Sequence, residues 1–175
     1  MKTISSYLVS QNQDLPKESI IAQVDYWPDQ KADWSHKILK DQRKLRLIRL
    51  SSPLGCFQVL FLWGKKVAQE SKAVPEPPKG QDILLKKSEL EAFLLESKDK
   101  NPLHQGDVAL LPAFFLLEAC LPYLPTSQQL SFRFLAPAYI QKQTLLTLLS
   151  SGQKAHLYQG PNLVLTMTQK GEETL

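Results

Sequence analysis

The feature that most restricts the fold is an apolar run of 14 residues, from Val108 to Leu121, with a single charged residue, Glu118. Pro112 lies near its start and Pro122 follows it directly, and proline favours the first turn of a helix and the residues just beyond its end. The run is too short to cross a bilayer, which takes about 20 apolar residues. It therefore predicts a helix that is apolar on every side and buried all round.

Short segments with strand character surround this helix. Residues 83–85 precede it, and four more segments follow it at Leu130–Leu135, Thr144–Leu149, Ala155–Gln159 and Asn162–Thr168. Turn residues separate the last three segments, which favours an antiparallel meander. One buried helix against one antiparallel sheet predicts an α+β arrangement in which the sheet wraps around the helix. A second helix is predicted over residues 88–97, where Ser88 and Glu91 have capping-box spacing.

A proline-rich segment, residues 73–80, divides the chain. Three prolines within four residues exclude a helix or a central strand there. We therefore expect a β-rich region over residues 1–72 and a second domain over 81–175. Within the first region we expect strands at Ile4–Val9 and Ile20–Tyr26, helical turns within 32–42, and a hairpin of Leu45–Leu50 with Cys56–Trp63.

Charge and cysteine content narrow the setting. Residues 1–80 carry 13 Lys and Arg against 8 Asp and Glu, whereas residues 81–175 carry 8 against 9. A basic front half suits an acidic partner such as an acyl carrier protein, or simply a solvated surface. No aromatic-basic interleaving or zinc pattern favours nucleic acid. Cys56 and Cys120 predict buried thiols in a reducing compartment, and no signal sequence or membrane span is visible, so we expect a cytoplasmic protein.

Three groups have the chemistry of an elimination or hydration site. Burial of Glu118 would raise its pKa and favour the neutral acid that a general acid needs, unless this side chain points to an edge. His104 lies in the loop before the helix, with Asp99 and Asn101 upstream, and a nearby carboxylate orients and tunes an imidazole. The helix start at Pro112 offers backbone N–H groups that stabilise a developing enolate.

The same residues resemble two related enzyme families. Residues 99–104, Asp-Lys-Asn-Pro-Leu-His, resemble the signature of MaoC-like (R)-specific enoyl-thioester hydratases. The spacing from His104 to Pro112-Ala113 and to Glu118-Ala119 is similar to that of the 3-hydroxyacyl-carrier-protein dehydratases. Residues 130–139, followed by Thr144-Leu145, look like the strand entry after the helix in MaoC-like proteins. The resemblance covers roughly residues 83–172.

This resemblance implies a hot-dog fold, an antiparallel sheet wrapped around a central helix, and a hydratase or dehydratase of enoyl or 3-hydroxyacyl thioesters. The substrate would be carried on coenzyme A or acyl carrier protein, without a metal or other cofactor. A homodimer, or two half-domains in one chain, is expected, with residues 1–72 as an incomplete second hot-dog half or as strands that extend the sheet. The resemblance implies catalytic roles for Asp99, His104 and Glu118, and substrate-binding roles for Asn101, Pro112, Ala113, Phe114 and Phe115.

Several residues depart from the pattern of these families. Lys98 and Ala113 each replace a glycine. The methyl group of Ala113 would narrow the space through which a thioester approaches the start of the helix. The His-Gly pair that many MaoC-like proteins carry on the central helix is absent. These departures keep two alternatives open. One is a non-catalytic acyl-thioester-binding protein or partner subunit, and the other is a hot-dog thioesterase in which Glu118 or Asp99 activates water.

Overall fold

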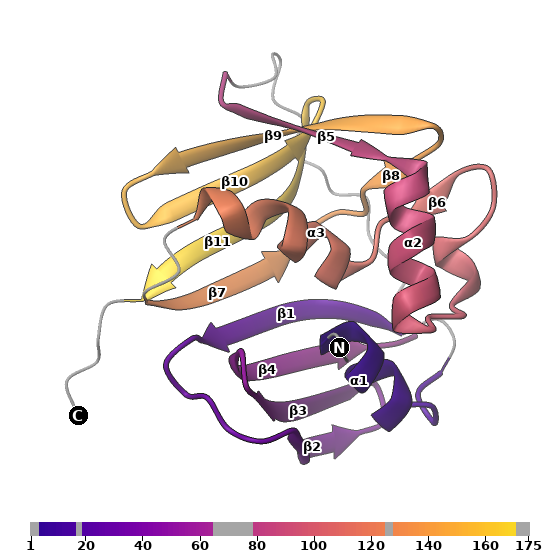
Figure 1. The fold of residues 1–175 in the computed structure, drawn as a ribbon, viewed down its shortest axis with the longest axis vertical. Helices are drawn as coiled ribbons and strands as arrows, with labels where there is room; N and C mark the ends of the chain where they lie inside the picture. The colour runs from indigo at the N-terminus through magenta and orange to yellow at the C-terminus, as the bar shows by residue number, and fades with distance from the viewer. Residues whose placement is uncertain (1–3, 17–18, 65–78, 125–127, 171–175) are drawn as a thin grey trace.

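The computed structural model describes residues 4–16, 19–64, 79–124 and 128–170. Within these residues nine strands form one antiparallel sheet in the order β2-β3-β4-β1-β7-β11-β10-β9-β5 (Figure 1). Two short strands, β6 (Ala109–Leu110) and β8 (Tyr139–Ile140), pair separately. No helix among the described residues is long and apolar enough to span a membrane.

The N-terminal half of the sheet consists of β1 (Ile20–Trp27), β2 (Ser35–Gln42), β3 (Leu45–Ser52) and β4 (Gly55–Leu62). The predicted hairpin is confirmed, because β3 and β4 pair along their whole length. Gly55 begins β4 with a φ of 134°, and a Cβ atom there would lie 2.6 Å from the carbonyl oxygen of Trp27. Glycine is therefore required at this turn.

Two predictions in this half are wrong. Residues 4–11 form a helix, α1 (Ile4–Gln11), and not a strand, because Tyr7 and Leu8 follow Ile4 at helical spacing and are buried beneath one face. Residues 35–42 form the strand β2 and not helical turns. All residues of β2 are exposed, and its sequence shows no alternation of apolar and polar residues. Pairing with β3 is therefore what makes this segment a strand.

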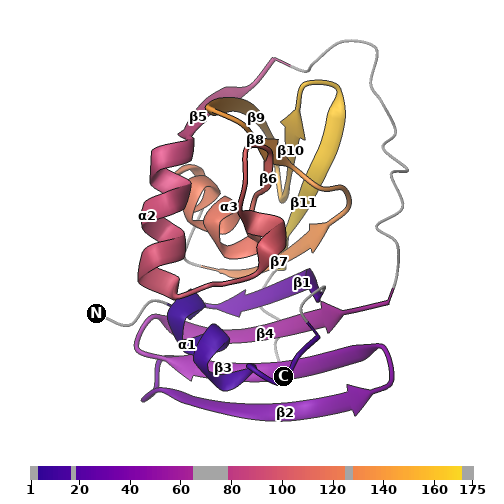
Figure 2. The ribbon, with the colours of Figure 1, turned by 90° about the vertical axis from the view of Figure 1, so that its right-hand side faces the viewer.

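The C-terminal half has the predicted α+β arrangement. Its strands curve around α3 (Ala113–Cys120), while α2 (Lys87–Ser97) lies beside them (Figures 1 and 2). The predicted strands are confirmed as β5 (Gln81–Lys86), β7 (Gln129–Phe134), β9 (Gln143–Ser151), β10 (Lys154–Gln159) and β11 (Asn162–Lys170). A sheet wrapped around a central helix is the hot-dog arrangement.

The capping residues of α2 differ from those predicted. The helix begins at Lys87, and the backbone N–H of Lys86 donates to the Glu89 carboxylate at 2.8 Å. The pairing of Ser88 with Glu91 is therefore wrong, because Ser88 already lies inside the first turn. Glu89 takes the capping role at the position where the chain leaves β5.

The two halves share one sheet. β1 pairs with β7 in antiparallel register from Gln23 opposite Arg133 to Tyr26 opposite Leu130. The N-terminal strands thus extend the sheet, as one of the two predicted arrangements requires. Residues 73–78 of the predicted linker lie outside the described residues, so the division of the chain at 73–80 stays a prediction.

The central helix α3 is buried on most of its surface. Five of its residues are buried: Phe114, Phe115, Leu116, Leu117 and Cys120. The predicted burial on every side is wrong, because Glu118 is exposed. Phe114, Leu117, Glu118 and Leu121 follow helical spacing and line a cavity that is shared with the N-terminal half and with Phe132 of β7.

Both cysteines are buried free thiols, as predicted. Burial raises the pKa of Cys120 to about 12. A thiol with such a pKa stays protonated near neutral pH and is a poor nucleophile.

Candidate active site

Asp99 directly follows the C-terminal end of α2. The backbone N–H groups of Lys98 and Asp99 both donate to the carbonyl of Leu94, which ends the helix. Lys98 has a φ of 56°, the left-handed conformation that favours glycine. The glycine that the resembling family has at this position therefore has a conformational role, and Lys98 meets the same backbone requirement at an energetic cost.

The loop between Asp99 and His104 is ordered by its own side chains. Asp99 Oδ1 accepts from the Asn101 N–H at 2.9 Å, and Asn101 Oδ1 accepts from the Leu103 N–H at 3.1 Å. A short 3-10 helix, η1 (Pro102–His104), follows with Asn101 as its cap. Asn101 thus orients the segment that carries His104, and its predicted contact with substrate stays a prediction.

His104 and Asp99 lie next to each other. His104 Nδ1 is 2.7 Å from the Leu110 carbonyl oxygen, which only accepts, so Nδ1 carries the proton. In the neutral ring Nε2 is then the free base, and it lies 3.7 Å from Asp99 Oδ2. That separation exceeds a direct hydrogen bond and suits a shared water or substrate hydroxyl. The two side chains are only 12% and 19% exposed.

A cavity of about 290 Å³ lies beside His104, between α2 and the loop at residues 104–107. The Lys87 ammonium donates to the Gly106 carbonyl at 2.7 Å and ties this loop to the start of α2. Leu90 and Leu94 form the apolar side of this cavity. The imidazole therefore borders a space that is open to a ligand.

A second cavity, of about 220 Å³, lies between the two halves of the molecule. One wall is the α3 face that carries Glu118, and Phe132 of β7 borders it. The opposite wall comes from the N-terminal half, with Ile4, Tyr26, Leu54 and Phe57. Glu118 is the only ionisable acid in this lining. Desolvation by the apolar lining and, next, the nearby Glu96 carboxylate raise the pKa of Glu118.

The predicted catalytic residues are thus brought together only in part. Asp99 and His104 face each other, whereas Glu118 lines the cavity between the halves, whose lining includes neither of them. The predicted burial of Glu118 is wrong because its side chain lies at the cavity between the halves and is exposed there. The raised pKa was nevertheless predicted correctly, with partial desolvation as its cause.

The start of α3 is where the sequence predicts an anion-stabilising site, and that role stays a prediction. Pro112 caps the helix, and its carbonyl accepts from the Leu116 N–H at 3.1 Å. Ala113, the first helical residue, is half-buried. The N–H groups of the first turn have no partner within the helix, and they carry the positive end of its dipole.

The two predicted substrate-binding phenylalanines have different surroundings. Phe114 lines the cavity between the halves and meets Phe57 at a centroid distance of 6.3 Å. Phe115 packs against Phe93 of α2 at 5.3 Å and is buried. Phe114 therefore borders a cavity, whereas Phe115 packs within the core, and the substrate-binding roles of both stay predictions.

Sequence reasoning did not single out the residues of the N-terminal wall. Tyr26 and Phe57 stack at 4.5 Å, and the Tyr26 hydroxyl donates to the Leu54 carbonyl at 2.8 Å. These residues belong to strands whose apolar pattern indicates only that they are partly buried. Among the described residues no group of three or more His, Cys, Asp or Glu side chains is placed to hold a metal ion.

No family model matches the sequence, and no curated protein matches it. Among solved structures, the chain is similar to HtdX of Mycobacterium tuberculosis, with a TM-score of 0.63 and 17% identity over 97% of this chain and 84% of that one. A second crystal structure of HtdX gives a TM-score of 0.64 at 15% identity, covering 95% and 82% of the two chains.

The chain is also similar to the full-length peroxisomal multifunctional enzyme type 2 of Drosophila melanogaster, with a TM-score of 0.54 and 14% identity. That match covers 96% of this chain and 41% of the fly enzyme. At such identities the likeness lies in the fold. The chain is therefore a hot-dog-fold protein, built like HtdX and the MaoC-like domain of the peroxisomal enzyme.

Proposed function

We propose that the protein is a hydro-lyase that adds water to, or removes it from, the acyl chain of a thioester carried on coenzyme A or acyl carrier protein. The observation that carries this proposal is the free Nε2 of His104 placed 3.7 Å from a carboxylate oxygen of Asp99. A base and a carboxyl group at that separation fit the proton and the hydroxyl of a β-elimination.

In the dehydration direction, His104 Nε2 takes the proton from the carbon next to the thioester carbonyl. The electron pair of that bond forms the new double bond, and the hydroxyl leaves with a proton from a carboxyl group as water. Charge that develops on the thioester oxygen is stabilised by the N–H groups at the start of α3, near Ala113. Hydration is the same sequence in reverse.

Asp99 is the better candidate for the carboxyl group that protonates the leaving hydroxyl group. It lies beside His104, and the same substrate atoms can reach both residues. Glu118 is the second candidate, because its raised pKa keeps more of the carboxyl group protonated than at an ordinary site. Its position on the other cavity favours a role at the acyl chain and not at the reacting carbons.

The comparisons support the same reaction class. HtdX is a hot-dog-fold 3-hydroxyacyl-thioester dehydratase, and the peroxisomal enzyme contains a MaoC-like domain. We further propose that the protein acts in the cytoplasm, where both thiols stay reduced, and that it forms a homodimer.

A non-catalytic acyl-thioester-binding protein or partner subunit is the alternative that a specific observation favours. Ala113 stands at the first position of α3, where its methyl group narrows the approach of a thioester to the free N–H groups. Such a protein would bind acyl-CoA without converting it. A thioesterase on the same fold would instead release free coenzyme A.

Hydration of crotonyl-CoA, followed by loss of the enoyl absorbance, tests the proposal. We expect turnover by the wild type and a loss of about 10²- to 10⁴-fold in His104→Ala and Asp99→Asn, the usual contribution of a general acid or base. His156→Ala is the matched control, since His156 is a half-buried histidine on β10 outside this site. Wild-type protein that is inert on several enoyl chain lengths would exclude the enzyme, and release of coenzyme A would indicate the thioesterase.

A further inference from the structure

Arg46 occupies a position that the strand pattern reserves for the core. Along β3 the buried residues are Arg46, Ile48, Leu50 and Ser52, which alternate with more accessible neighbours. Arg46 itself is 8% exposed. A guanidinium on the inner face of a sheet destabilises the fold unless it is paired, so its partners indicate what it holds in place.

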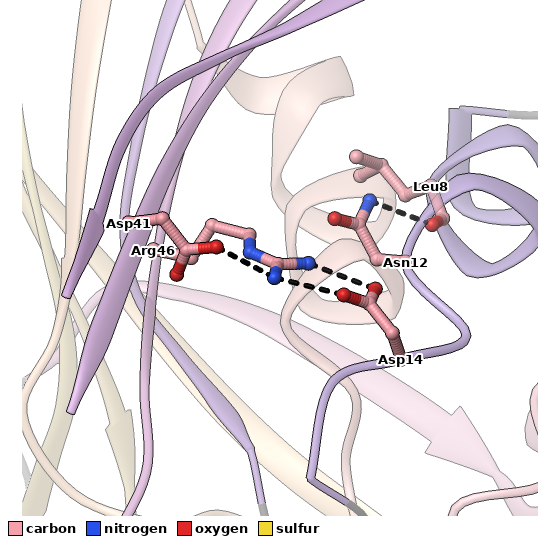
Figure 3. Close-up of polar contacts among 5 residues, drawn as sticks. All are labelled: Leu8, Asn12, Asp14, Asp41 and Arg46. Carbon is pink, nitrogen blue, oxygen red and sulfur yellow. Dashed lines mark hydrogen bonds and ion pairs between the residues drawn. The ribbon is translucent and has the colours of Figure 1, made fainter. Parts of the chain in front are cut away.

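The partners of Arg46 join α1 to the sheet. Its Nη1 and Nη2 donate to the two oxygens of Asp14 at 2.8 and 2.9 Å, and Nη2 also donates to Asp41 at 2.8 Å (Figure 3). Asp14 follows the C-terminal end of α1, whereas Asp41 belongs to the neighbouring strand β2. The hydrogen bonds from Arg46 hold the pKa of Asp14 below its ordinary value. We call these three residues the Arg46 clamp.

The clamp fixes one end of α1, and the other end reaches the cavity between the halves. Asn12 donates to the Leu8 carbonyl at 3.0 Å and closes the last turn (Figure 3). In the middle of the helix the Tyr7 ring packs on Trp34 at 4.9 Å. At the first turn Ile4 lines the cavity. The position of this wall residue therefore depends on how the rest of the helix is anchored.

The cavity has the size and chemistry for an alkyl chain. Apart from Glu118 at its rim and the Tyr26 hydroxyl, its lining is apolar. An engineered cavity of about 150 Å³ holds the six carbons of benzene, so in proportion a cavity of 220 Å³ has room for about nine carbons. The hydroxyl of Tyr26 already donates to Leu54, which leaves the aromatic ring toward the ligand.

We propose that α1 is the wall that limits how long an acyl chain this cavity accepts, and that Arg46 is the positioning residue that holds the wall through Asp14. This proposal rests on the proposed function in one respect, because the occupant is taken to be the alkyl chain of an acyl thioester. It assigns to the N-terminal half a role in selecting the substrate.

Conservative substitutions at the two partners of Arg46 separate its role in positioning α1 from its role in stability. Asp14→Asn removes the charge and one of the two acceptors that link Arg46 to the end of α1, whereas Asp41→Asn changes the other carboxylate and leaves that link intact. Both lower the thermal midpoint. We expect Asp14→Asn alone to raise kcat/KM for dodecenoyl-CoA relative to octenoyl-CoA, because a displaced α1 admits a longer chain, by about fourfold or more, the value of one buried methylene. An equal change in both variants, or in neither, would overturn the proposal.

A substitution at Leu54, on the same wall as Ile4 but outside α1, tests the occupant itself. Leu54→Trp fills the cavity from its exposed rim, and Leu84→Trp on β5 is the matched control, because the two leucines are 45% and 49% exposed. In calorimetry with saturated acyl-CoAs, Leu54→Trp should weaken octanoyl-CoA much more than butanoyl-CoA, and Leu84→Trp should weaken neither. Equal losses for both ligands in Leu54→Trp would contradict an alkyl-chain site.

The two proposals fail in different ways. Calorimetry with saturated acyl-CoAs requires no turnover, so a protein that hydrates no enoyl chain would refute the hydro-lyase and leave the chain-length result standing. A protein that hydrates crotonyl-CoA, and whose chain-length ratio is insensitive to Asp14→Asn and Leu54→Trp, would refute the role of α1 alone.

Discussion

The two halves of the sheet are covered by helices of the same length that are held in different ways. In the C-terminal half α3 buries five residues, none of them charged, and the strands curve around it. In the N-terminal half α1 buries Ser5, Tyr7 and Leu8 and lies across one face of the strands (Figure 2). A helix that is wrapped on most sides is held by apolar contact alone. The helix α1 also lies against α2, and Asp14, three residues after its end, is bonded to Arg46 of the sheet.

The largest effect should come from deleting core side chains in the two helices. Leu116→Ala in α3 should lower the free energy of unfolding by about 3 to 5 kcal/mol, because strands surround the vacated space and cannot close it. Leu8→Ala in α1 should lower the free energy of unfolding by about 2 kcal/mol, because α1 can move toward the sheet and reduce the cavity that the substitution leaves. Urea unfolding measures both. A larger loss for Leu8→Ala would contradict the difference in how the two helices are held.

A smaller effect, of opposite sign, is expected at the C-terminal end of α2. Lys98→Gly should raise the free energy of unfolding by about 0.5 to 1 kcal/mol, because glycine adopts the left-handed conformation without the side-chain penalty. Lys100→Gly is the control, since Lys100 has a negative φ and gains nothing from glycine. Thermal unfolding of both variants tests this. If both glycines destabilise equally, strain at Lys98 does not contribute.

The smallest effect concerns Glu118, where α3 faces the N-terminal half. Its pKa in the folded protein lies above the ordinary 4.5, so in the pH range just above 4.5 the folded state binds more protons than the unfolded state. Unfolding free energy attributable to this group therefore falls as the pH rises through that range. Glu118→Gln should remove this slope and slightly stabilise the protein at neutral pH.

Glu96→Gln sharpens the same measurement. It removes the second cause of the shift and should reduce the slope without abolishing it, since desolvation by the cavity lining remains. Unfolding curves at several pH values compare the three proteins. A slope that is unchanged in Glu118→Gln would show that the carboxyl group is fully solvated in the folded protein.

Much of the C-terminal half could be predicted from the sequence. The apolar run at 108–121 is buried along most of α3, and the strands after it are found close to the predicted positions. These predictions succeed because periodicity and turn residues are local properties. The adjacency of Asp99 and His104 also depends on a short loop, whose bonds lie within the segment itself.

Local sequence patterns account for the strands, the apolar helix and the short segment that pairs a carboxylate with an imidazole. Long-range packing sets the helical state of residues 4–11, the exposure of Glu118, and the bonding of Arg46 to Asp14 across 32 residues of chain. The reason is physical. Local conformation follows from neighbouring residues, whereas burial and ion pairing depend on which distant surface each face of an element meets.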